Sequence, residues 1–381
     1  MILASTLSAA HLAFFAAATL ILAAMHGFVW RRLCHDPKWP QAWSKPLAIT
    51  FCLAALGILP ALSLWHSLPS PYGSFLQIAV STWLGLLFIT FVIFILRDLI
   101  RLPLRLMRPP PHDPARRLFL ERSGAGAAAA LSLGSCSVAA TQALGDWRIT
   151  EVKLKPEVLG PAAEGLRLVQ ISDLHIGPLL GRAWAAELVE RANSLKPDLI
   201  CITGDMVDGS VEELRQEVAP LAGLQAPHGV FLCLGNHDHY SGAEEWIAHW
   251  QSLGFRVLRN QSFQIDLPHG RLRLAGLDDE SSKPDVTATF AEAANSEPCL
   301  ILAHQPRAIH RLQERRGLVL SGHTHAGQIW PFGYVVLLVQ PYLEGLHEHK
   351  SGLWIHVSPG TGFWGPPLRL GTRCEITLIH A

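Results

Sequence analysis

Five short polar clusters in the C-terminal half most strongly constrain what this chain folds into. Each directly follows an apolar run that is typical of a buried strand. In chain order they contain Asp173 and His175; Asp205 and Asp208; Asn236, His237 and Asp238; His304; and His323 and His325. In open α/β sheets, functional sites gather beyond the carboxyl ends of the strands. We therefore expect the five strand ends to meet at one edge and to form one site.

The rest of the C-terminal half, from about residue 147, alternates short apolar runs with amphipathic segments. Strands are predicted at residues 166–172, 199–203, 230–234, 272–277, 300–303, 318–320, 353–357 and 375–379. Apolar residues recur with helical spacing over residues 182–195. Strand–helix alternation followed by strands without an intervening helix predicts an α/β fold with two packed mixed β-sheets flanked by helices.

The N-terminal region is apolar enough to enter a membrane. Hydrophobic residues make up 49% of the chain and charged residues 16%. Residues 2–30 and 46–96 contain no Asp, Glu, Lys or Arg, and a Pro/Gly-containing turn from Leu68 to Gly73 divides the second stretch. Each piece exceeds the roughly 20 apolar residues that cross a bilayer. We predict three transmembrane helices within residues 1–122 that act as an anchor, because ion pathways usually need charged groups inside the spans.

A fourth apolar segment, residues 123–146, separates this anchor from a catalytic domain predicted at residues 147–381. Arg116 and Arg117 precede it. Two interpretations stay open: an internal twin-arginine export signal, or a basic anchor before an ordinary helix. Basic residues crowd both loops of the anchor, which predicts that these loops face the cytoplasm. If the fourth segment crosses, this is a multi-pass protein of a bacterial inner membrane with residues 147–381 outside the cytoplasm; otherwise that domain stays inside.

Charge is divided unevenly between the two halves. Residues 1–122 hold 11 Lys and Arg against 4 Asp and Glu, a net charge of +7, whereas residues 123–381 hold 20 against 27, a net charge of −7. An acidic domain without a basic stripe is a poor match for the phosphate backbone of nucleic acids. We expect no nucleic-acid partner.

The polar clusters supply the ligands for two divalent cations held side by side. Two cations about 3.5–4 Å apart need a bridging ligand, and a carboxylate serves both. Asp205, in a Gly-Asp turn, is the candidate bridge. Asp173, His175 and His325 are expected at one metal, and Asn236, His304 and His323 at the other. His237 is left over and is a candidate proton donor to a leaving oxygen, oriented by Asp208 or by Asp238.

In this order the clusters resemble the calcineurin-like metallophosphoesterase superfamily, whose pattern is D-x-H, G-D-x-x-D, G-N-H-D/E, H and G-H-x-H. The flanking residues are similar to the membrane-associated bacterial YkuE-type branch, for example Gly322–Ile329. Ala326 departs from that branch, which usually has Gly there. The resemblance implies a four-layer sandwich and a cofactor of two divalent metal ions. His, Asp and Asn ligands suit Mn, Fe, Zn or Co alike.

The resemblance also implies the reaction. A water between two metals loses a proton near neutral pH and attacks phosphorus, while the metals neutralise the phosphate oxygens. We expect a phosphodiester or phosphomonoester substrate near the membrane, with lipid-linked and cell-wall-derived esters as candidates. One alternative is a cytoplasmic-facing pyrophosphatase of a nucleotide-linked acylated sugar. Another is a non-catalytic scaffold, which the complete set of metal positions disfavours.

A third informative stretch, residues 329–346, is apolar and aromatic, and residues 362–365 resemble it. One interpretation is an apolar rim beside the metals that faces the bilayer and admits an acyl chain. The other is ordinary core packing. Nearby, His239 and Tyr240 either contact substrate or pack locally, and Asp278 and Asp279 either line the site or cap a turn.

Overall fold

The computed structural model describes residues 9–64, 68, 72–107 and 113–381, which form two compact units, residues 1–139 and 140–381. Residues 2–8, which begin the first predicted span, lie outside the described residues. Most of the predicted turn between Leu68 and Gly73 lies outside them as well. Each unit is described by itself below.

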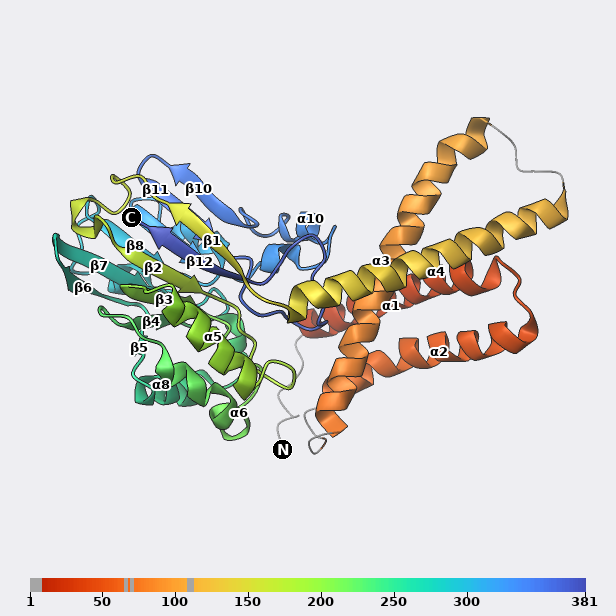
Figure 1. The fold of residues 1–381 in the computed structure, drawn as a ribbon, viewed down its shortest axis with the longest axis horizontal. Coiled ribbons are helices and arrows are strands. Elements are labelled where there is room, and N and C mark those ends of the chain that lie inside the picture. The colour runs from red at the N-terminus through yellow and green to blue at the C-terminus, as the bar shows by residue number, and fades with distance from the viewer. Residues whose placement is uncertain (1–8, 65–67, 69–71, 108–112) are drawn as a thin grey trace. The chain divides into compact units, whose positions relative to one another are not determined.

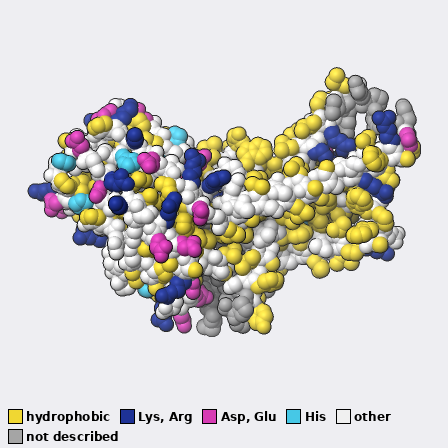
Figure 2. Space-filling model, viewed as in Figure 1, with side chains coloured by type: hydrophobic (Ala, Val, Ile, Leu, Met, Phe, Trp, Pro, Cys, Tyr) yellow, Lys and Arg dark blue, Asp and Glu magenta, His cyan; other side chains and the backbone are white. Residues whose placement is uncertain are grey.

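The N-terminal unit consists of long helices (Figure 1). They are α1 (Ala9–Trp30), which continues into a π-helical turn (Arg31–His35), α2 (Gln41–Leu64), α3 (Tyr72–Met107) and α4 (Pro114–Leu144), whose last turn belongs to the second unit. The helices share a small core that includes Val29, Phe51 and Phe94. Figure 2 shows apolar side chains crowded over their surface. Such exposure is unfavourable in water and suits a lipid environment.

Two helices of the described chain are long and apolar enough to cross a membrane: α3, over Tyr72–Pro103, and α4, over Pro114–Leu144. The fourth predicted segment is thus the greater part of a continuous helix. Membrane spans in α1 and α2, and the domain limits at residues 122 and 146, stay predictions.

The two basic segments that the sequence assigns to one side of the membrane lie side by side within the first unit. Arg32, after α1, pairs with Asp98 in α3 at 2.6 Å. Arg122, in α4, donates to the carbonyl oxygen of Lys38 at 2.8 Å. The charged residues at this end of the helices therefore come from the segment after α1, from α3 and from α4. This is expected if both loops contact the same aqueous compartment.

The second unit contains two six-stranded mixed sheets (Figure 1). The first has the order β1-β12-β2-β3-β4-β5, with β1 Arg148–Lys153, β12 Glu375–His380, β2 Arg167–Ile171, β3 Leu199–Thr203, β4 Val230–Cys233 and β5 Arg256–Val257. The second has the order β10-β11-β9-β8-β7-β6, with β10 Gly345–Lys350, β11 Leu353–Val357, β9 Arg316–Ser321, β8 Pro298–Leu302, β7 Gly270–Gly276 and β6 Gln261–Leu267. β2 to β5 are parallel, as are β7, β8, β9 and β11.

The sheets pack face to face and are covered outside by helices, which gives four layers. Between them, Leu168, Phe231 and other side chains of the first sheet meet Leu274, Leu300 and Leu320 of the second. The outer face of the first sheet is covered by α5 (Arg182–Ser194), α6 (Val211–Val218) and α8 (Ala243–Ser252). The outer face of the second packs against α9 (Val286–Thr289) and a 3-10 helix (Pro306–Arg311). The predicted fold class is confirmed.

A buried polar contact also joins the two sheets below the strand ends. Gln170 of β2 donates to the carbonyl oxygen of Ser321 in β9 at 2.9 Å, and its side-chain oxygen lies 2.7 Å from Nδ1 of His356 in β11. Burial lowers the pKa of His356 to about 4, so its ring is neutral. Because buried polar groups need partners, this contact fixes how the two sheets align.

Candidate metal centre

The predicted ligands lie in the loops that directly follow five parallel strands. Asp173, Asp205, His304 and His323 each come two residues after the end of β2, β3, β8 and β9, respectively, and Asn236 opens the short helix α7 (Asn236–Tyr240) after β4. The first sheet therefore supplies three of these positions and the second sheet supplies two. The site lies where the carboxyl ends of both sheets meet.

The backbone at these ligands is strained. Asp173, His175, Asp205, His323 and His325 all have a positive φ, between 47° and 69°. Residues other than glycine rarely adopt this left-handed region, and such strain gathers at functional sites. The tight turns bring the ligand side chains back over the strand ends.

Glycines let these turns approach one another closely. A Cβ on Gly235 would overlap the carboxylate of Asp205, and one on Gly322 would overlap that of Asp173. Both glycines belong to the motifs of the sequence. They are needed for space between neighbouring loops, because each lies against a carboxylate that serves as a candidate ligand.

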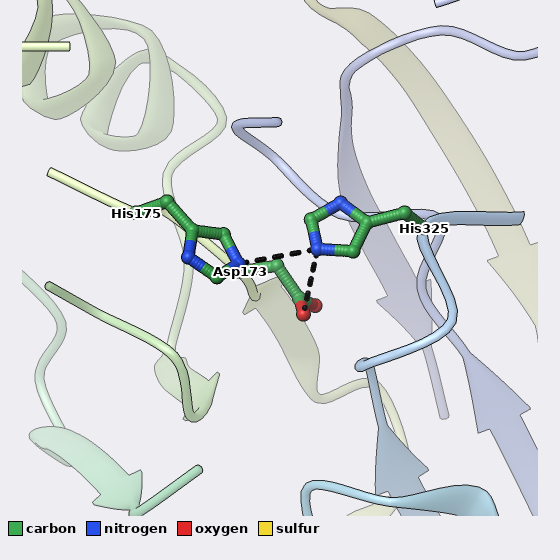
Figure 3. Close-up of side chains that lie close together, drawn as sticks. All are labelled: Asp173, His175 and His325. Atoms are coloured by element: carbon green, nitrogen blue, oxygen red, sulfur yellow. Dashed lines mark hydrogen bonds and ion pairs between the residues drawn. The ribbon is translucent and has the colours of Figure 1, made fainter. Parts of the chain in front are cut away.

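Asp173, His175 and His325 form the first cluster (Figure 3). Nε2 of His325 lies 3.1 Å from Nε2 of His175 and 3.4 Å from Oδ1 of Asp173. The Asp173 carboxylate also accepts the backbone N–H of His323 at 2.9 Å, which ties the first ligand loop to the last. All three members of the cluster are buried.

Asp205, His304 and His323 form the second cluster. Nε2 of His304 lies 3.0 Å from Oδ2 of Asp205, and the same oxygen lies 3.8 Å from Nε2 of His175. Asp205 therefore faces both clusters, as a bridging ligand must. Asn236, the remaining predicted ligand, is buried beside this loop.

Hydrogen bonds at the far side of two rings show which nitrogens face the centre. Nδ1 of His304 lies 2.7 Å from the carbonyl oxygen of Thr203, and Nδ1 of His175 lies 3.1 Å from Asp208. With the Nδ1 side of each ring held by an acceptor, each Nε2 faces the centre. Metal-binding histidines characteristically donate their second N–H to a carbonyl or a carboxylate in this way.

Two buried polar atoms of the described chain lack a hydrogen-bond partner at this place: Nε2 of His304 and Oδ1 of Asn236. Although Nε2 of His304 is close to Asp205, the geometry is not that of a hydrogen bond. A buried polar atom without a partner is costly, and cations are the natural partner for lone pairs that converge. The residues present therefore fit two divalent cations.

Electrostatics divide the histidines into two kinds. Burial alone would lower the pKa of His175, but Asp208, Asp205 and Asp173 raise it to about 9. By contrast, burial and the neighbouring His304 lower the pKa of His323 to about 4. Despite its burial, Asp205 has a pKa well below its usual range, because His304 and His175 surround it. A cation that replaces protons here would meet the ionised carboxylate of Asp205.

His237, the candidate proton donor, is held by Asp208. Its Nδ1 lies 2.7 Å from Oδ1 of Asp208, and its side chain stays partly exposed. The same Asp208 oxygen contacts His175, so one carboxylate orients a candidate ligand and the candidate acid. Of the two carboxylates named in the sequence analysis, Asp208 is the one whose contact with the His237 ring is seen.

Asp238 has another task. Its carboxylate accepts the backbone N–H groups of Asp205, Met206 and Gly235 at 2.8–3.0 Å. Burial, together with the charge of Asp205, raises the pKa of Asp238 to about 6. Asp238 thus fixes the loop of the bridging ligand.

Arg369 is a site residue that sequence reasoning missed. It is fully buried, and its guanidinium donates to the carbonyl oxygens of Gly362 at 2.6 Å and Pro359 at 2.8 Å. It also lies 3.2 Å from Nδ1 of His325. After burial and the charge of His175, the charge of Arg369 lowers the pKa of His325, which favours the neutral ring.

The other residues named near the site divide between packing and surface. His239 pairs with Asp278 at 2.7 Å, and Asp279 accepts from Gln305 at 3.0 Å, so these groups brace the loops around the site. Tyr240 is 72% exposed, and its ring lies 5.5 Å from that of His237. It therefore lies beside the candidate proton donor.

Comparisons with known proteins agree with this geometry. The family profile "Calcineurin-like phosphoesterase" matches residues 166–327. An uncharacterized metallophosphoesterase of Helicobacter pylori is 36% identical over 238 residues, which are 60% of this chain and 63% of that protein. A transmembrane protein with metallophosphoesterase domain of Danio rerio is 35% identical over 61% of this chain and 56% of its own length.

The uncharacterized metallophosphoesterase YkuE of Bacillus subtilis is 32% identical over 240 residues, which are 60% of this chain and 84% of that protein. The chain belongs to the calcineurin-like metallophosphoesterase family. It spans less than two thirds of the length of the Helicobacter and zebrafish relatives.

Proposed function

We propose that this protein is a metal-dependent hydrolase of phosphoric esters, acting on phosphodiesters or phosphomonoesters near a membrane. One observation carries the proposal: Nε2 of His175, Nε2 of His304 and Oδ2 of Asp205, all of them buried, converge between two clusters of candidate ligands. Membership of the metallophosphoesterase family supports the same activity.

Seven residues would hold the two cations. Asp173, His175 and His325 would serve one, Asn236, His304 and His323 would serve the other, and Asp205 would be shared by both. When bound, two such cations lower the pKa of a shared water and neutralise the phosphate oxygens. Mn, Fe, Zn and Co all suit this mixture of imidazole and oxygen ligands.

His237 and Asp208 handle the proton of the leaving group. Nδ1 of His237 faces Asp208, so its Nε2 is free to donate to the departing oxygen of the ester. The histidines around Asp208 overcome its burial and hold its pKa below the usual range. An ionised carboxylate beside Nδ1 holds the ring in a fixed orientation, as a general acid requires.

The test is metal analysis of the purified full chain together with hydrolysis of chromogenic phosphodiesters and phosphomonoesters. Asp205→Ala should lose metal and activity together. His237→Ala should keep its metal and lose about 10²–10⁴-fold in rate on esters with poor leaving groups. His269→Ala, an exposed change in the turn that opens β7, away from the site, is the matched control. Activity that survives Asp205→Ala with full metal content would contradict the proposal.

We also propose that the chain is a multi-pass protein of a bacterial inner membrane with the catalytic domain outside the cytoplasm. The two apolar helices and the paired basic segments support this arrangement. A reporter that is active only outside the cytoplasm, fused after Ala381, should be active. An inactive reporter, with a cytoplasmic one active at the same position, would reverse the orientation.

A further inference from the structure

An exposed apolar surface begins at the turn that carries His325. Residues 329–343 contain no charged side chain, and the short helix α10 (Gly333–Val336) within them buries none of its residues. Trp330, Phe332 and Leu337 are about half exposed, and Leu338 is 82% exposed. With Trp364 and Tyr240, these side chains form what we call the apolar rim. Soluble proteins seldom expose such a patch unless something covers it.

Close packing and the side chain of Gln328 fix the apolar rim to the turn that carries His325. The start of α10 packs on Gly327, where a Cβ would overlap the backbone of Gly333. Gln328 donates to the carbonyl oxygen of Trp364 at 2.8 Å and accepts its N–H at 2.9 Å. The Trp364 ring lies 5.8 Å from the ring of His237. Whatever covers this surface therefore lies next to the proton donor.

The chain itself indicates which partner this is. Ala143, in the last turn of the candidate span α4, packs with Phe363, the neighbour of Trp364. Residues 145–147 separate that helix from β1, a tether of about 10 Å at full extension. A domain on so short a tether would stay at the surface of a bilayer that α4 crosses. Tryptophan and tyrosine favour this interface, where their rings are buried and their polar atoms stay hydrated.

A positive charge at the edge of the apolar rim also favours a lipid bilayer as the partner. Arg307 is exposed, and its backbone N–H donates to the side chain of Gln340, the residue that follows the apolar stretch 330–339. A guanidinium beside an apolar surface places its stem among apolar groups and its charge among anionic headgroups.

We propose that the apolar rim inserts into the lipid bilayer and that the metal centre opens at the level of the headgroups. The docking is a property of the surface alone. Its consequence for substrate choice rests on the proposed function: the preferred ester would be an amphiphile whose phosphate lies in the headgroup region while its acyl chains stay in the membrane.

Fluorescence quenching tests the docking without any use of activity. The full chain is reconstituted into vesicles of phosphatidylethanolamine and phosphatidylglycerol, with or without bromine on the acyl chains. The difference in emission between wild type and Trp330→Phe, or Trp364→Phe, isolates each rim tryptophan. Both differences should shrink strongly in the brominated vesicles. The matched control is Trp354→Phe. Trp354 is at the start of β11 and so at the end of the sheet opposite to the metal centre. The difference in emission between wild type and this variant should persist in the brominated vesicles.

Rim tryptophans quenched no more than Trp354 would overturn the proposal. In that case, light scattering that shows a dimer in wild type and a monomer in Leu338→Ser would assign the surface to a second copy of the chain.

Kinetics then test the consequence for substrate. The triple variant Trp330→Ser, Phe332→Ser, Leu337→Ser should lose about tenfold or more in kcat/KM on an ester held in vesicles, since each side chain contributes membrane-burial free energy. It should stay near wild type on a soluble ester, which also shows that it folds. Equal losses on both esters would overturn the substrate preference. Quenching in a protein that hydrolyses no ester at all would leave the docking intact and refute the proposed function.

Discussion

Replacing Asp208 by Asn tests both tasks of this carboxylate, the orientation of His175 and the orientation of His237, in one variant. In the wild type, one oxygen lies 2.7 Å from Nδ1 of His237 and 3.1 Å from Nδ1 of His175. Asn keeps the shape but loses the charge, and its amide group turns a second donor toward the His175 ring. The variant should therefore weaken the orientation of a metal ligand and of the proton donor at once.

The magnitudes follow from each task. Removing the partner of a metal-binding histidine typically lowers metal affinity about 10- to 100-fold, or about 1.4–2.8 kcal/mol. Loss of support for the general acid should cost up to about 10²-fold in rate at saturating metal, below the full contribution of such an acid. The rate loss should grow as the leaving group becomes poorer, because a poor leaving group needs its proton most.

Metal affinity is measured by competition with a chelator, and rates with a series of aryl phosphodiesters. His237→Ala is the matched comparison, because it removes the acid and leaves Asp208 against His175. It should retain wild-type metal affinity and show the same dependence on the leaving group. If Asp208→Asn binds metal as tightly as the wild type, then Asp208 does not orient His175, and our account of the centre is wrong.

Three further changes test the fold around the site. Ala326→Gly should raise the free energy of unfolding by about 1 kcal/mol, measured by denaturation, because Ala326 has a φ of 51° that glycine adopts without strain. Phe231→Ala should lower the free energy of unfolding by about 3–5 kcal/mol, because it leaves a cavity between the sheets. A loss below about 1 kcal/mol would mean that the sheets move together and fill the cavity. Asp278→Asn should destabilise most between about pH 4 and 6.5, followed as melting temperature. Hydrogen bonds to His239 and Arg259 outweigh burial and lower the pKa of Asp278 to about 2, so the stability that its charge contributes is lost as pH falls toward that value. The pKa of His239 is raised, so the stability that its charge contributes is lost as pH rises above about 6.5. A destabilisation that is independent of pH would show that the charges of this pair contribute nothing.

The central strands could be read from the sequence, but the four edge strands could not. β2, β3, β4, β8 and β9 are buried on both faces and appear as continuous apolar runs. β1, β5, β6 and β10 are the outermost strands of the two sheets, and none of them appears among the predicted strands. Each contains exposed positions or lacks fully buried ones, so polar residues interrupt its pattern.

At the site, the sequence indicated which residues are candidate ligands. It indicated only some of the residues that hold those ligands in place. Metal chemistry restricts ligands to a few residue types, and their glycine neighbours mark tight turns. Arg369 left no comparable signal, because its hydrogen bonds go to main-chain carbonyls, which every sequence presents. The double role of Asp208 depends on the turn after β3 facing the turn after β2, a distance that spacing in the sequence does not encode.

The pairing of β1 with β12 has a consequence for how the catalytic domain reaches its final form. β12, near the C-terminus, lies between β1 and β2 and pairs with both. Residues 148–153 must therefore wait for a partner that is synthesised more than 200 positions later. Contacts of such long range form slowly. During biosynthesis the edge of β2 would stay unpaired, and chaperones or strands of other chains could bind it, until β12 is synthesised and pairs there.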